Sequence, residues 1–166
     1  AEREYIAAFD RLPPAPPPVT HRPSPSEIPM KRILIVGDPN SRDFVNKAYG
    51  DLAQVTFASS VADAEALIAD NRPSIVIGTL AFDESRFLNL LPLLMELQIK
   101  TVVVECPYTI TNDATVEAVK LYANDMGVAA WWDMRRTVAN EGLEVAGKEI
   151  RAIVQGLLND RLPREP

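Results

Sequence analysis

Five short apolar runs alternate with stretches of helical periodicity, and this alternation limits the folds that the chain can adopt. Most of the runs are apolar at every position, which is typical of strands buried on both faces. Such strands separated by helices predict a parallel sheet with helices on both sides, in a doubly wound α/β fold. The predicted strands are Ile33–Val36, Gln54–Ala58, Ser74–Gly78, Thr101–Val104 and Val128–Trp132.

Polar residues with short side chains precede several of the predicted helices. Asp38, Ser60 and either Asn112 or Asp113 can accept hydrogen bonds from the free N–H groups at a helix start. Gly127 is suited to end the fourth helix, because glycine tolerates the left-handed conformation there. We therefore expect helices that begin near these three positions.

The third and the final helix of the domain carry less regular signals. Pro92 should kink or split the third helix, which is predicted over 83–97. A long final helix is predicted over 138–158, and Leu158 at the edge of its apolar stripe is a candidate for a dimer face. The stripe expected to face the core consists of Leu143, Ala146, Ile150, Ile153, Val154 and Leu157. The folded domain is expected over 30–160, with a short tail over 161–166.

The first 29 residues differ from the rest of the chain. Residues 1–12 place Tyr5, Phe9 and Leu12 on one stripe, which predicts a short amphipathic helix. Residues 13–29 hold eight of the 14 prolines and predict an extended spacer of the polyproline type. The segment is interpreted either as a passive linker or as a Pro-rich arm that docks on a protein partner through these three side chains.

Charge and cysteine content exclude several classes of function. The 166 residues include 17 basic and 23 acidic side chains, a net charge of -6, which argues against nucleic acid or an anionic membrane as the main partner. The single cysteine, Cys106, excludes an internal disulfide and a multi-cysteine zinc site, and it suits the cytoplasm. No apolar run reaches the roughly 18 residues that a membrane-spanning helix needs. His21 is the one histidine, so a histidine–nucleophile pair inside the domain is not expected.

Three stretches carry a resemblance to a known family. They are the strand and turn over 32–38, the helix, proline and strand over 64–77, and the strand over 127–132. Together they resemble the receiver domain of bacterial response regulators, over residues 31–160. The resemblance implies a flavodoxin-like sheet of strand order 2-1-3-4-5. It also implies that the functional edge lies at the carboxyl ends of strands 1, 3, 4 and 5.

The resemblance also implies a degenerate site. A receiver needs an acidic pair for Mg²⁺, which here reads Gly37 and Asp38, and a phosphoryl-accepting aspartate, which aligns with Thr79. Its Ser or Thr aligns with Cys106, and its lysine with Met134. Without these groups, phosphoryl transfer assisted by Mg²⁺ has no chemical basis. We therefore expect no enzymatic activity, no bound metal and no cofactor.

Two other groups of residues admit alternatives. Asp38, Glu105 and Asp133 could converge on a divalent cation, or they could be one helix cap and two solvated loop acids. Cys106 could be a reactive thiol or a small half-buried apolar residue. Of two adjacent tryptophans in a strand, one should pack under the last helix. The other, Trp131, aligns with the receiver aromatic on a face that contacts partners, or else both tryptophans are core residues.

These observations favour a receiver-like module that binds proteins without phosphorylation, in signalling or in complex assembly. Two alternatives stay open. One is a small-molecule binder or enzyme of another flavodoxin-like family, which would use the carboxyl edge of the sheet. The other is an architectural subunit of a multiprotein complex. The oligomeric state and the partner are not defined by the sequence.

Overall fold

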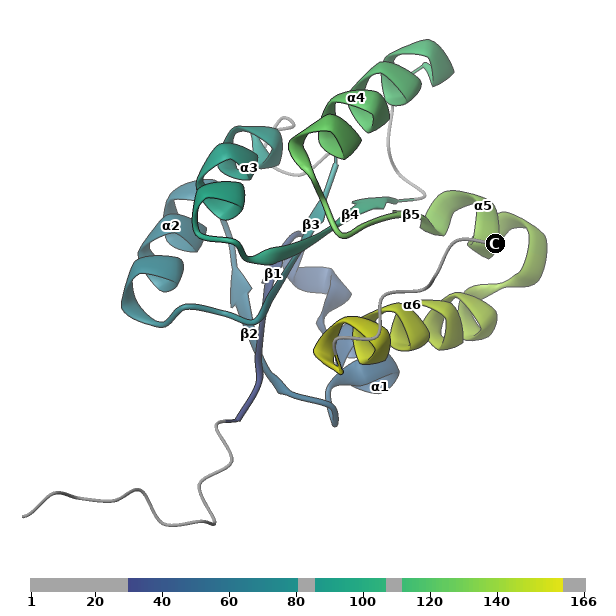
Figure 1. The fold of residues 1–166 in the computed structure, drawn as a ribbon. Helices are drawn as coiled ribbons and strands as arrows, with labels where there is room; N and C mark the ends of the chain where they lie inside the picture. The colour runs from purple at the N-terminus through teal and green to yellow at the C-terminus, as the bar shows by residue number, and fades with distance from the viewer. Residues whose placement is uncertain (1–29, 81–85, 107–111, 160–166) are drawn as a thin grey trace, which may run out of the picture.

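A sheet of five parallel strands forms the middle layer of the molecule (Figure 1). The computed structural model describes residues 30–80, 86–106 and 112–159. The strand order is β2-β1-β3-β4-β5, which confirms the predicted fold class. The predicted helix over 1–12 and the spacer over 13–29 lie outside the described residues. The strands are β1 (Arg32–Val36), β2 (Gln54–Ala58), β3 (Ile75–Thr79), β4 (Lys100–Glu105) and β5 (Ala130–Asp133).

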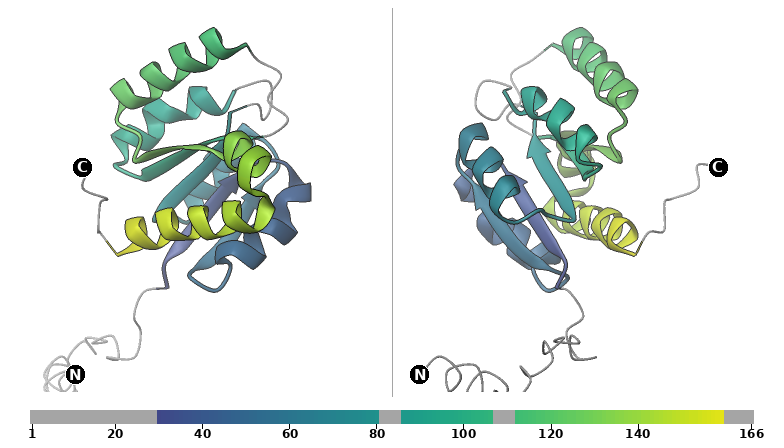
Figure 2. Two further views of the ribbon diagram at one scale, coloured as in Figure 1. Left: turned by 90° about the vertical axis from the view of Figure 1, so that its right-hand side faces the viewer. Right: turned by 60° about the vertical axis from the view of Figure 1, so that its left-hand side comes forward.

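Helices cover both faces of the sheet (Figure 2). One face is covered by α1 (Arg42–Tyr49) and α6 (Leu143–Leu158), and the other by α2 (Val61–Asp70), α3 (Phe87–Glu96) and α4 (Asp113–Met126). A 3₁₀ turn, η2 (Pro39–Ser41), precedes α1, and α5 (Met134–Glu141) follows β5 directly. None of the helices within the described ranges is long and apolar enough to cross a membrane.

Alternate residues of the central strands supply two separate cores. In β1, Ile33 and Ile35 pack with α1 and α6, whereas Leu34 and Val36 pack with α2, α3 and α4. All four side chains are almost fully buried. This is why the run is apolar at every position, as the sequence indicated.

The predicted helix caps are present. The Ser60 hydroxyl accepts a hydrogen bond from the Asp63 amide at 3.1 Å, and the Asn112 side chain accepts one from the Thr115 amide at 2.8 Å. Gly127 ends α4 with a φ of 95°, in the left-handed region that favours glycine.

Other expectations were wrong, and the final helix is the clearest case. Two helices replace the single one predicted over 138–158, because Gly142 turns the chain between them with a φ of 88°. This break leaves Leu143 55% exposed instead of in the core, whereas Leu158 is buried and does not form a dimer face. Pro92 lies inside α3 without splitting it.

Close packing between β3 and α3 gives a test of this architecture. A Cβ atom at Gly78 would overlap the ring of Phe87, which is fully buried. Gly78→Ala should therefore lower the free energy of unfolding by about 1–3 kcal/mol or more in urea denaturation. Combining it with Phe87→Leu should cost less than the sum of the two single changes, because leucine leaves room for the new methyl group.

A matched control lies in α6. A Cβ atom at Gly147 would meet Phe44 and Ala48 at 3.8 Å, which is an ordinary contact. Gly147→Ala should thus raise stability, by up to about 1 kcal/mol from helix propensity. Equal effects of the two glycine substitutions would contradict the packing described at β3.

Candidate functional site

The carboxyl ends of β1, β3, β4 and β5 meet at one edge of the sheet, where the sequence placed the candidate site. The register pairs Val36 with Gly78, so Gly37 and Thr79 lie next to each other just beyond this pair. Farther along the edge, Glu105 pairs with Asp133. The edge therefore has two parts, one without acidic side chains and one with two of them.

Gly37 and Thr79 form the first part. A Cβ atom at Gly37 would lie 2.9 Å from the Thr79 hydroxyl oxygen, which is closer than real side chains approach. The hydroxyl of Thr79 thus occupies the space in which a side chain at position 37 would begin. Neither residue carries a carboxylate, and a threonine hydroxyl is not ionised at neutral pH.

Asp38 and Asp133 are both occupied as helix caps. The Asp38 carboxylate accepts a hydrogen bond from the Asn40 amide at 2.8 Å, and that of Asp133 accepts one from the Arg136 amide at 2.8 Å. Capping of this kind stabilises a helix start by about 1 kcal/mol. Across the described ranges, no group of three acidic, cysteine or histidine side chains is placed to hold a metal ion. The prediction that Asp133 is a solvated loop acid was wrong.

Glu105 is the most unusual residue at this edge. It is only 3% exposed, so the expectation of a solvated loop acid was also wrong here. Its Oε1 lies 2.9 Å from the Nη2 of Arg135 in α5, and the same nitrogen lies 3.4 Å from Asp113 at the start of α4. One guanidinium therefore links the end of β4 to the starts of two helices.

Neighbouring groups shift the pKa of Glu105 in opposite directions. Burial raises the pKa of its carboxyl group, and the negative charge of Asp133 raises it further. Arg135 and a hydrogen bond from Trp131 lower the same pKa, but they do not fully offset the first two effects. Sequence analysis missed the pairing with Arg135. The available signal was an arginine in the first turn of the helix that follows the neighbouring strand.

The two tryptophans of β5 face opposite sides of the sheet, as alternation requires. Trp132 is buried under α6, as predicted, and its indole N–H donates to Glu149 at 2.9 Å. The Thr137 hydroxyl donates to the same carboxylate at 2.7 Å, which joins β5, α5 and α6. Trp131 is half-buried and packs with the core of α3 and α4.

The last two predicted site residues lie one position farther along the edge. Cys106 follows β4 and is half-buried. Met134 begins α5 and packs against the core on the α1 and α6 side. Neither position offers the hydroxyl or the lysine that a receiver places there.

Comparisons with known proteins identify the architecture. The chain matches a signal receiver domain of a LuxO repressor protein from Vibrio parahaemolyticus, with 13% identity, a TM-score of 0.53, and coverage of 82% of this chain and 99% of the other. It matches the chemotaxis protein CheY4 of Vibrio cholerae with 17% identity, a TM-score of 0.51, and coverage of 75% and 98%.

A BeF3-activated DrrB receiver domain matches with 14% identity, a TM-score of 0.51, and coverage of 76% and 98%. This chain has the receiver fold. At these identities the similarity concerns the fold alone. No family model matches the receiver-like domain, and the search of curated proteins finds no relative.

Burial of Glu105 makes stability depend on pH in a defined direction. Its folded-state pKa is raised above the ordinary value of 4.5, so its contribution to stability is fully present below that pH and is lost as pH rises through the folded pKa. The free energy of unfolding of the wild type should therefore fall relative to that of Glu105→Gln as the pH rises above the ordinary pKa of 4.5. Urea denaturation at each pH measures the difference.

Glu144→Gln serves as the control for this measurement. Glu144 is exposed, and its pKa is lowered by Lys148, so any difference from the wild type should be small and of opposite sign. If the free energies of unfolding of the wild type and Glu105→Gln differed by the same amount at every pH, the raised pKa of the buried Glu105 carboxyl would be contradicted.

Proposed function

We propose that this receiver-like domain is a non-catalytic module that binds other proteins, in signalling or complex assembly, without being phosphorylated. The observation that carries the proposal is the contact between Gly37 and Thr79. These positions align with an acid of the Mg²⁺ pair and with the phosphoryl acceptor of receivers. Here one has no side chain, and the other fills the adjacent space with a hydroxyl group.

The remaining acids do not fit a receiver's magnesium site. Mg²⁺ requires oxygen ligands in near-octahedral geometry, usually with one or two carboxylates. Asp38 and Asp133 are engaged as helix caps, and Glu105 forms an ion pair with Arg135. A cation would have to compete with these contacts.

The surface formed by α4 and β5 is the better candidate for function, and we call it the Trp131 face. Trp131 is half-buried there, and α4 carries Leu121 at 64% and Tyr122 at 45% exposure. Large aromatic and aliphatic side chains that are exposed on a helix are typical anchors of protein interfaces. They support a protein partner on this side of the sheet.

No contact within the described ranges favours the other two functions that the sequence left open. A ligand at the carboxyl edge would have to compete with two helix caps and an ion pair. No contact among the described residues distinguishes an architectural subunit of a complex from the proposed protein-binding module. The cytoplasmic setting also stays a prediction.

Reaction with a small phosphodonor tests the loss of chemistry. The full chain, incubated with acetyl phosphate and Mg²⁺, should gain no phosphoryl group by intact mass spectrometry, because no carboxylate stands at position 79. A receiver with all of its acidic residues, treated in parallel, is the positive control. Thr79→Asp alone should also stay unmodified, since Gly37 supplies no second carboxylate. A stoichiometric phosphoryl adduct on the wild type would refute the proposal.

Binding to a partner tests the Trp131 face. A partner is first identified by native pull-down with the full chain and mass spectrometry, and its Kd is then measured by calorimetry. Trp131→Ala should weaken binding by about 30-fold, corresponding to about 2 kcal/mol for an interface anchor. Trp131→Phe should retain most of the affinity.

Leu67→Ala is the matched control, because it removes a half-buried apolar side chain from α2, which packs against β2 and β1 at the other end of the sheet from β5. Circular dichroism verifies that each variant is folded. Unchanged affinity in a folded Trp131→Ala variant, or a larger loss in Leu67→Ala, would show that the partner binds elsewhere.

A further inference from the structure

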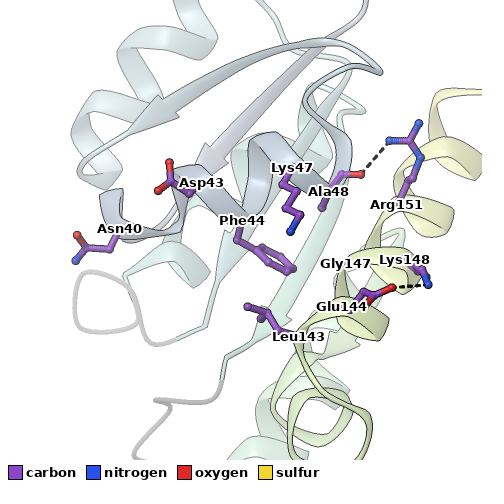
Figure 3. Close-up of a pocket in the computed structure, with 10 residues that line it drawn as sticks. All are labelled: Asn40, Asp43, Phe44, Lys47, Ala48, Leu143, Glu144, Gly147, Lys148 and Arg151. Carbon is purple, nitrogen blue, oxygen red and sulfur yellow. Dashed lines mark hydrogen bonds and ion pairs between the residues drawn. The ribbon is translucent and has the colours of Figure 1, made fainter.

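A groove runs between α1 and α6 on the face of the sheet opposite Trp131 (Figure 3). Its volume is about 810 Å³, which lies within the range of sites that bind substantial ligands. The apolar part of its lining consists of Phe44 and Ala48 from α1 and Leu143 and Gly147 from α6. In Figure 3, Phe44 and Leu143 project toward each other across the groove.

Two features of α6 create the groove. Gly147 has no side chain, so it adds none to the lining beside Ala48 and the Phe44 ring, which lie 3.8 Å from the place of a Cβ atom, at ordinary contact distance. The break at Gly142 starts α6 at Leu143 and leaves that side chain 55% exposed at the groove. An exposed leucine beside a half-buried phenylalanine forms an apolar surface that water solvates poorly.

The groove is flanked by charged side chains. Lys47, Lys148 and Arg151 line it, against the two carboxylates Asp43 and Glu144, in a chain whose net charge is -6. Lys148 pairs with Glu144 at 2.8 Å. Arg151 binds Asp51, outside the groove, through two hydrogen bonds of 2.6 and 2.9 Å. With these two ion pairs formed, the remaining Lys47 and Asp43 balance, so the charge around the groove is close to neutral and its apolar centre suits the apolar side of an amphipathic segment.

We propose that the groove binds the chain's own residues 1–12. This segment places Tyr5, Phe9 and Leu12 on one side at helical spacing, so that three large apolar side chains can enter a single groove. It holds three acidic and two basic residues, a net charge of -1, so a nearly neutral lining does not repel it. Tyr5, Phe9 and Leu12 would then contact α1 and α6 of the same molecule and not a partner protein.

The connection is long enough for this arrangement. The described chain begins at Met30, beside Lys31, whose ammonium group donates to the carbonyl of Leu158 at the carboxyl end of α6. The seventeen residues 13–29 can span about 50 Å in a polyproline conformation. A twelve-residue helix is about 18 Å long, compared with about 24 Å for the sixteen residues of α6. The arm can therefore reach the groove and lie along it.

A spin label on the arm tests this proposal in the full chain. Cys106 is the single cysteine, so Cys106→Ser combined with Ala7→Cys gives one labelling site, on the helix side opposite Tyr5 and Phe9. A nitroxide at position 7 should broaden the amide NMR signals of α1 and α6 that line the groove. The signals of α3, on the other face of the sheet, should keep their intensity.

Substitutions on both sides of the contact define the expected pattern. Phe9→Asp on the arm and Gly147→Leu in the groove should each restore the broadened signals. Gly147→Ala should leave the broadening in place, because one methyl group fills little of the space. The unaffected signals of the sheet verify that each variant is folded.

Three results would overturn the proposal. The first is an absence of broadening in α1 and α6, and the second is broadening centred on the Trp131 face. The third comes from a mixture of ¹⁵N-labelled chains without nitroxide and unlabelled chains with it. Broadening of the groove signals in this mixture would show that the arm binds a second copy and not its own domain.

Discussion

Burial of β1, β3 and β4 between two layers of helices is the constraint on which the rest of the structure depends. Successive side chains of each strand point to opposite faces, so each strand contributes to both cores. The helices on each face must then pack closely against these side chains. At Gly78 the requirement is extreme, since the ring of Phe87 occupies the place of a side chain. A sheet held this tightly fixes the positions of its carboxyl ends, and therefore of every residue at the candidate site.

The same constraint explains the charges at the edge. Glu105 ends a strand that is buried on both faces, so its carboxylate is removed from water. A buried carboxylate without an opposite charge would strongly destabilise the fold. Arg135 supplies the opposite charge from α5, and this position is available because Asp133 caps α5 directly after β5. The edge is thus organised by charge pairing and helix capping, two structural tasks that leave its acids committed.

The parts of this structure that were predictable from sequence are those determined by local patterns. Apolar runs located all five strands, and Ser60, Asn112 and Gly127 marked helix ends through hydrogen bonds to neighbours in the chain. The break at Gly142 was missed because a single glycine is compatible with either a continuous or an interrupted helix. Burial of Glu105 and the groove at Gly147 depend on segments distant in sequence. The ion pair with Arg135 and the groove between α1 and α6 form only when these distant segments pack together.

The strand β5 is the element that both candidate surfaces share. Trp131 contributes to the face of α3 and α4, while Trp132 is anchored through Glu149 to α6, which forms one wall of the groove. A ligand on either surface can influence the other only by favouring one arrangement of shared elements, and the coupling free energy is then the same in both directions. If the carboxyl edge carries no phosphoryl group, the coupling between the two surfaces depends on binding alone. Binding at the groove and binding at the Trp131 face would then regulate each other in place of phosphorylation.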